Sequence, residues 1–208
     1  MNGASPLVAA GLGFGLGVVT GMPLGVLNVA IIDAATAGRR RFARGIGIGG
    51  GVADTLHAII AFAGVGHVVT ADPALVRGLA ITTATAIIAY AVRAWRRRQR
   101  TLDPRVDART DDEVSVARGL ATGIILTLPN PAALAAWVAV AAAVWPGATL
   151  LEASLIAGGV GIGSALWFTL LARWIRRMRR DHPVLTWIPR VALVFLIAIA
   201  VVGIVRVL

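Results

Sequence analysis

Few side chains in this sequence could do chemistry, and Asp54 is the most informative of them. It lies nine residues into an apolar stretch and shares a helical face with His57 and several glycines. A carboxylate at the centre of a membrane span costs about 2.5 to 3.5 kcal/mol on insertion scales. We therefore expect Asp54 to face inward and to bind a cation or a proton, with a hydrogen-bonded packing role as the alternative.

Helix-breaking residues supply a second set of polar positions. Pro23 and Asn28 interrupt the first long apolar stretch, and Pro129, Asn130 and Pro131 interrupt the fourth. Backbone groups freed at membrane depth need partners inside the protein or in a hydrated cavity. The N–H groups and the positive dipole at the start of a half-helix suit a carboxylate. The paired breaks therefore predict a solute site, to which both asparagines add polar contacts.

Membrane helices must position these residues. Hydrophobic residues make up 58% of the chain and charged residues 14%, and residues 1–32 carry no charge. No basic segment precedes the first apolar stretch, which argues against a cleavable signal peptide. We expect an all-α membrane protein with six transmembrane helices, of which the first and the fourth are broken by Pro and Asn. The predicted spans are 7–32, 45–69, 73–95, 116–145, 151–174 and 187–207.

Regular offsets along the chain indicate an internal duplication. Pro23 and Pro129 lie 106 residues apart, and Arg77 and Arg190, which border the two shortest spans, lie 113 residues apart. Because each half crosses the membrane three times, the second half must be inverted, as in many secondary transporters. Generic scatter of Gly and Pro in an alanine-rich protein is the alternative.

The corresponding domain organisation is a single transmembrane domain over residues 1–208. It consists of one repeat over about 5–98, a cytoplasmic linker over about 96–115 and a second repeat over about 116–208.

Charge predicts the orientation of these spans. The net charge is +10, and 18 of the 20 basic residues lie in or beside the connections that follow the first, third and fifth spans. Under the positive-inside rule these connections are cytoplasmic, which places both termini outside. Topology and contact with anionic headgroups explain the charge, so a nucleic-acid partner has little support. We expect a multi-pass protein of the bacterial inner membrane.

Five motifs occur in a characteristic order: PLGVLN at 23–28, GRRR at 38–41, GIGIGGGVAD at 45–54, RG at 118–119 and LPNP at 128–131. In this order the sequence resembles the LysE (lysine exporter) and RhtB type of amino-acid exporter over nearly its whole length. It departs from the more usual Pro-Gly-Pro-Asn form of the first motif. The resemblance implies export of small amino acids or similar solutes, driven by an ion gradient.

These features together predict a secondary transporter, not an enzyme, that exports amino acids or similar small polar solutes with the proton gradient. Asp54 would hold the ammonium group or carry the coupling proton, with His57 beside it. The counterpart of Asp54 in the second repeat falls near Ser164, so one carboxylate suggests one coupling position. No cofactor or metal ion is expected, because the histidines are scattered and the chain has no cysteine.

Other functions stay open. A metal-cation exporter of a related six-helix type would have a poor coordination shell. A membrane-embedded lipid-modifying enzyme needs clustered acid, base or nucleophile groups, which only Asp33 and residues 39–44 approach. An accessory subunit would use the glycine faces for helix association alone, and the same faces permit a homodimer. For Asp33 itself we expect an interfacial ion pair with the arginine cluster.

Overall fold

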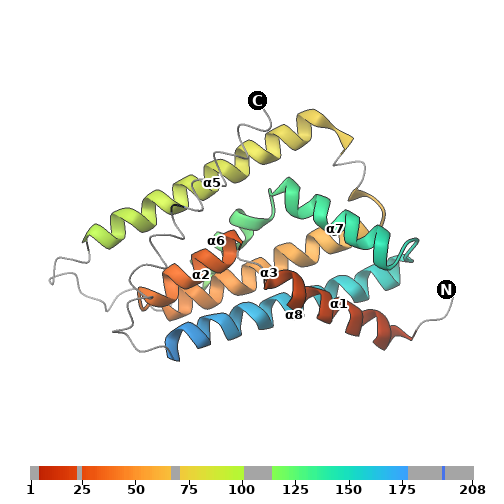
Figure 1. Ribbon diagram of the computed structural model, residues 1–208, viewed down its shortest axis with the longest axis horizontal. Helices are drawn as coiled ribbons and strands as arrows, with labels where there is room; N and C mark the ends of the chain where they lie inside the picture. The colour runs from red at the N-terminus through yellow and green to blue at the C-terminus, as the bar shows by residue number, and fades with distance from the viewer. Residues whose placement is uncertain (1–4, 23–24, 67–70, 101–113, 178–193, 195–208) are drawn as a thin grey trace.

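The computed structural model is all-helical in the part of the chain that it describes, which comprises residues 5–22, 25–66, 71–100, 114–177 and 194 (Figure 1). The predicted span 187–207 therefore lies almost wholly outside the described residues. The helices are α1 (Pro6–Gly21), α2 (Val26–Thr36), α3 (Arg40–Phe62), α5 (Pro73–Arg100), α6 (Val114–Thr127), α7 (Pro131–Val144) and α8 (Leu150–Arg177).

Three of these helices are long and apolar enough to cross a membrane without a break, namely α3, α5 and α8. The segments predicted as spans one and four each form two helices that meet at an angle, 69° between α1 and α2 and 73° between α6 and α7. If each bent pair is one span, the described residues contain up to five spans. The prediction of an all-helical protein that can span a membrane is confirmed.

The helix α3 begins five residues earlier than the predicted span. Arg40, Arg41 and Arg44 therefore lie on the first two turns of this helix, where the sequence suggested a loop. Arginine is a good helix former, and Gly38, with a positive φ of 77°, makes the turn that separates α2 from α3. The basic residues are consequently held on a rigid element.

The contact between α1 and α8 is made by glycines on both helices. A Cβ added at any of the four would overlap backbone atoms of the facing helix. In lipid, helices associate through close van der Waals packing, and residues without side chains permit it. The four glycines are Gly13, Gly17, Gly159 and Gly163.

The contact between α3 and α6 is built in the same way. Here too a Cβ on any of four glycines would overlap the backbone of the facing helix: Gly45, Gly49, Gly119 and Gly123. The helix α3 also contacts α2, α7 and α8, so it lies at the centre of the bundle (Figure 1). Residues on different sides of α3 therefore face different neighbours.

Asp33 forms the expected ion pair, and its carboxylate is buried, whereas Arg39 is half-buried. The Asp33 carboxylate lies 3.0 Å from the Arg39 guanidinium, and the residue is only 1% exposed. The Tyr90 hydroxyl of α5 donates to the Asp33 carboxylate at 3.2 Å and lies 3.0 Å from the Ala30 carbonyl. The ion pair thus joins the end of α2 to the start of α3, and the Tyr90 hydrogen bond joins the same carboxylate to α5. The expected ion pair is present, and its position at the membrane interface stays a prediction.

The glycine contacts predict that Gly17→Ala destabilises the fold, whereas Gly15→Ala on the same helix does not. A methyl group at position 17 meets the α8 backbone, while nothing lies within 4 Å of a Cβ at position 15. Overpacking costs about 1–3 kcal/mol. Thermal unfolding in detergent should show a lower midpoint for Gly17→Ala alone, and equal midpoints for the two variants would contradict the contact.

Candidate functional site

The break between α6 and α7 interrupts the helical hydrogen bonds, and two side chains replace the missing partners of one separated pair. In a continuous helix the Ala132 N–H would donate to the Leu128 carbonyl. Instead the Ala132 N–H donates to the Asn130 side-chain oxygen at 3.0 Å. The Leu128 carbonyl accepts from Nε2 of His57 at 2.9 Å. Both separated groups are therefore satisfied, as burial in a membrane requires.

The three residues of this break have distinct roles. Pro131 is the first residue of α7, where its missing N–H costs nothing, and Asn130 is the N-cap. Asn130 accepts a second bond from the Ala133 N–H at 3.4 Å. Pro129 lies in the turn between the two helices. The sequence predicted all three as solute contacts, and the structure gives the two prolines a place in the break itself.

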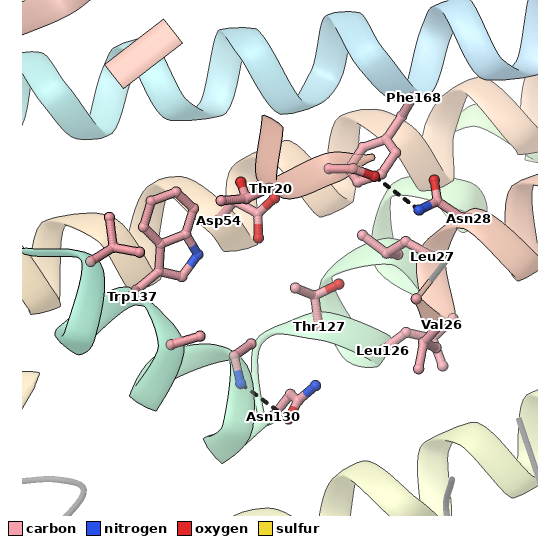
Figure 2. Close-up of a pocket in the computed structure, with 15 residues that line it drawn as sticks. Thr20, Val26, Leu27, Asn28, Asp54, Leu126, Thr127, Asn130, Trp137 and Phe168 are labelled. Carbon is pink, nitrogen blue, oxygen red and sulfur yellow. Dashed lines mark hydrogen bonds between the residues drawn. The ribbon is translucent and has the colours of Figure 1, made fainter. Parts of the chain in front are cut away.

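The break between α1 and α2 is joined differently. The side-chain amide of Asn28 in α2 donates to the Gly21 carbonyl at the end of α1, at 2.9 Å (Figure 2). Gly25 is the N-cap of α2 and makes no side-chain cap hydrogen bond. The start of α2 thus keeps its backbone donors and positive dipole without a capping side chain, unlike the start of α7. Pro23 lies outside the described residues.

Both breaks open onto one cavity of about 220 Å³. A single water needs only about 15 Å³, so the cavity has room for a small solute. Figure 2 shows Asn28, Asp54, Thr127 and Asn130 around this space. Its lining comes from six helices and the N-cap residues of two of them: Thr20, Gly21, Gly25, Val26, Leu27, Asn28, Asp54, Leu126, Thr127, Asn130, Ala133, Ala136, Trp137, Val140 and Phe168.

Asp54 of α3 is the one charged residue among the described residues that line the cavity. It is partly exposed, and the side chains of Ser164 and Trp137 lie near its carboxylate. The indole nitrogen of Trp137 is on the side of the ring that faces Asp54 (Figure 2). The Ser164 hydroxyl also lies 3.2 Å from the Gly17 carbonyl, to which it donates. A negative charge thus faces a mainly apolar space.

The structure brings Asn28, Asp54 and Asn130 to one cavity. His57 is not among the residues that line this cavity. The His57 side chain is 2% exposed, and its Nε2 donates to the Leu128 carbonyl at the break between α6 and α7. Its position beside Asp54 in the sequence places it one turn along α3, where it contacts Leu128.

Sequence reasoning missed Thr127, Trp137 and Phe168. The Thr127 hydroxyl is buried at the cavity and has no hydrogen-bond partner among the described residues. Its place just before the LPNP motif was a signal for this role. Trp137 and Phe168 gave no such signal, because an aromatic residue in an apolar helix equally suits contact with lipid.

Comparison with known families decides the class of the protein. The family described as LysE type translocator matches residues 18–206. The chain belongs to this family. Membership confirms the resemblance of the motifs and identifies a multi-pass membrane translocator rather than a family of enzymes. No curated protein and no solved structure matches the chain.

The Asn130 cap yields a test of how the second break is held. Asn130→Ala removes the acceptor of the Ala132 and Ala133 N–H groups and should lower the unfolding free energy by about 0.5–2 kcal/mol. Asn130→Ser keeps a capping oxygen and serves as the matched control. Chemical unfolding in micelles measures both, and an Ala variant as stable as the Ser variant would show that the cap is dispensable.

Proposed function

We propose that this translocator is a secondary transporter that exports amino acids or similar small polar solutes across the bacterial inner membrane, coupled to the proton gradient. One observation carries the proposal: two helix breaks and an acidic side chain from a third helix line the same cavity. Family membership supplies the class of protein, and the cavity supplies the place where a solute binds.

The start of α2 is the proposed site for the carboxylate of the solute. Gly25, Val26 and Leu27 line the cavity, and the first turn of α2 has no side-chain cap. Its backbone N–H groups and positive dipole favour an anion. The start of α7 is a poorer site, because Asn130 already accepts two of its N–H groups. The Thr127 hydroxyl offers a further hydrogen bond.

Asp54 is the proposed site for the ammonium group, or for the coupling proton when the solute has left. An ammonium group and a proton each neutralise the carboxylate, so binding of one disfavours binding of the other. Such competition at one carboxylate is a simple basis for exchange of a solute against protons. It also argues against a metal cation as the solute, because a single carboxylate makes a poor coordination shell.

The charge inventory of the cavity favours a solute with a neutral side chain. A zwitterion places its ammonium at Asp54 and its carboxylate at α2, which uses the one charged residue among the described lining residues. A solute with an additional positive charge would need a second carboxylate in a low-dielectric space. The remaining lining is dominated by Val, Leu, Ala and Phe side chains, which suit small apolar groups.

Asp54→Asn should abolish gradient-driven efflux, because an amide neither binds an ammonium group strongly nor exchanges a proton. Efflux of a panel of radiolabelled amino acids from proteoliposomes measures this, and the variant should fall to the level of empty vesicles. Asp72→Asn is the matched control, since Asp72 accepts N–H groups at the exposed start of α5. Unchanged efflux by Asp54→Asn would remove Asp54 from the mechanism.

We further propose that the bundle consists of two inverted repeats of three spans, with the helix contacts in support. The glycines of α1 precede those of α6 by 106 residues, and the glycines of α3 precede those of α8 by 114 residues. Exchanging the two halves therefore turns the α1–α8 contact into the α6–α3 contact. By the offset of 114 residues Asp54 corresponds to Phe168, four residues after the expected Ser164, and both Asp54 and Phe168 line the cavity at the breaks.

Sidedness tests the proposed orientation, with the Arg-rich connections cytoplasmic and the termini outside. The chain has no cysteine, so Ala37→Cys before α3 and Ala71→Cys after it each give a single labelling site, and both positions are exposed. A membrane-impermeant maleimide should label position 71 in intact spheroplasts and position 37 only in inside-out vesicles. The reverse pattern would overturn the proposed orientation. Labelling of both positions from the same side would show that α3 does not cross the membrane.

A further inference from the structure

The start of α3 and the end of α8 lie at the same end of the bundle (Figure 1). A second cavity lies between residues of these two helix ends. Its volume is about 90 Å³, and it shares no lining residue with the cavity at the breaks. Three arginines and a threonine supply its polar lining, Arg40 and Arg44 from α3 and Thr169 and Arg173 from α8. Ala35, Ala43 and Ala172 complete the wall.

No ion pair involves these three arginines within the described residues. The ion pair found there joins Arg39 to Asp33 and leaves Arg40, Arg44 and Arg173 without a carboxylate. The three arginines are exposed residues, and their guanidinium groups repel each other across the space that they line. The positive-inside rule explains why basic residues collect at one end of a bundle, but not why three of them from two helices converge on one cavity.

The remaining features of this cavity suit an anion with several oxygen atoms. The guanidinium group is planar and presents paired donors that match phosphate oxygens. The N-cap of α3, Arg39, makes no side-chain cap hydrogen bond, so the positive end of the α3 dipole adds to the same field. Trp174 follows Arg173 and is 62% exposed, as expected for an aromatic residue at the level of lipid headgroups.

We propose that this cavity is a phosphate-binding site, in which Arg40, Arg44 and Arg173 hold the phosphate group of an anionic ligand between α3 and α8. Two sources carry this chemistry, the headgroup of an anionic phospholipid and a soluble phosphate. Binding of either neutralises the repulsion among the three guanidinium groups and ties the start of α3 to the end of α8. The bound protein is therefore more stable than the free protein.

The test uses the purified full-length protein in detergent after removal of native lipid. Short-chain phosphatidylglycerol and inorganic phosphate are titrated separately at constant ionic strength, with short-chain phosphatidylcholine as the zwitterionic lipid control. The thermal unfolding midpoint, followed by tryptophan fluorescence, reports binding. Either anionic ligand should raise the midpoint, and phosphatidylcholine should not.

Variants locate the site. Arg44→Gln and Arg173→Gln should each weaken binding about tenfold or more, because each removes a charge-assisted contact. Arg96→Gln, an exposed arginine of α5 that does not line the cavity, is the matched control and should bind as the natural protein does. Arg44→Lys retains the charge and should keep intermediate affinity, which guards against loss of folding in the glutamine variants.

The two titrations separate the sources of the phosphate. A shift with phosphatidylglycerol alone assigns the site to a lipid headgroup, and a shift with both ligands assigns it to the phosphate group itself. The proposal is overturned if neither ligand shifts the midpoint, or if Arg44→Gln and Arg173→Gln bind no more weakly than Arg96→Gln. Efflux activity plays no part in this readout, so failure of the transport proposal would leave the result unaffected.

Discussion

The need to satisfy backbone hydrogen bonds without water controls the rest of this structure. A helix break at membrane depth exposes donors and acceptors whose desolvation costs several kcal/mol unless partners are supplied. At the second break His57 and Asn130 supply both partners, one from α3 and one from the break itself. The His57 contact fixes α3 against the α6–α7 turn, and Asp54 lies one turn earlier on the same helix. The hydrogen bond from His57 to the Leu128 carbonyl therefore also helps to position the Asp54 carboxylate at the cavity.

Glycine contacts determine the depth and rotation of the helices around that cavity. With backbones touching at the α1–α8 and α3–α6 contacts, neither pair can slide or rotate without collision. The helix α3 also packs against α8, so the two close pairs form one body around which α2, α5 and α7 are arranged. The cavity lies where α1 and α6 end and α2 and α7 begin, because the bends direct α2 and α7 away from the axes of α1 and α6. Close packing in one part of the bundle and open space in another thus have a common origin.

Sequence alone predicted the features that have strong local causes. Proline within an apolar stretch ends a helix wherever it occurs, and a carboxylate in such a stretch must face inward, so both breaks and Asp54 were found. Contacts between residues that lie far apart in the sequence could not be predicted from local sequence patterns. Asp33 accepts a hydrogen bond from Tyr90, which lies 57 residues away, and His57 donates to a carbonyl 71 residues away. Trp137 was missed because its place at the cavity opposite Asp54 depends on the packing of separate helices, whereas its own segment is uniformly apolar.

The two breaks are alike in sequence but differ in their hydrogen bonds. This difference gives the two ends of the cavity different electrostatic potentials. Asn130 turns its oxygen onto the start of its own helix and caps it, whereas Asn28 donates backwards to the end of the preceding helix and leaves α2 without a side-chain cap. One half-helix therefore offers positive potential to the cavity and the other offers little. Asp54 supplies the opposite sign from α3. A solute with separated positive and negative charges has one favourable orientation between them, and reversing it would place its carboxylate against Asp54. The two breaks thus build a site that is not symmetric, as the proposed binding of a zwitterion in a single defined orientation requires.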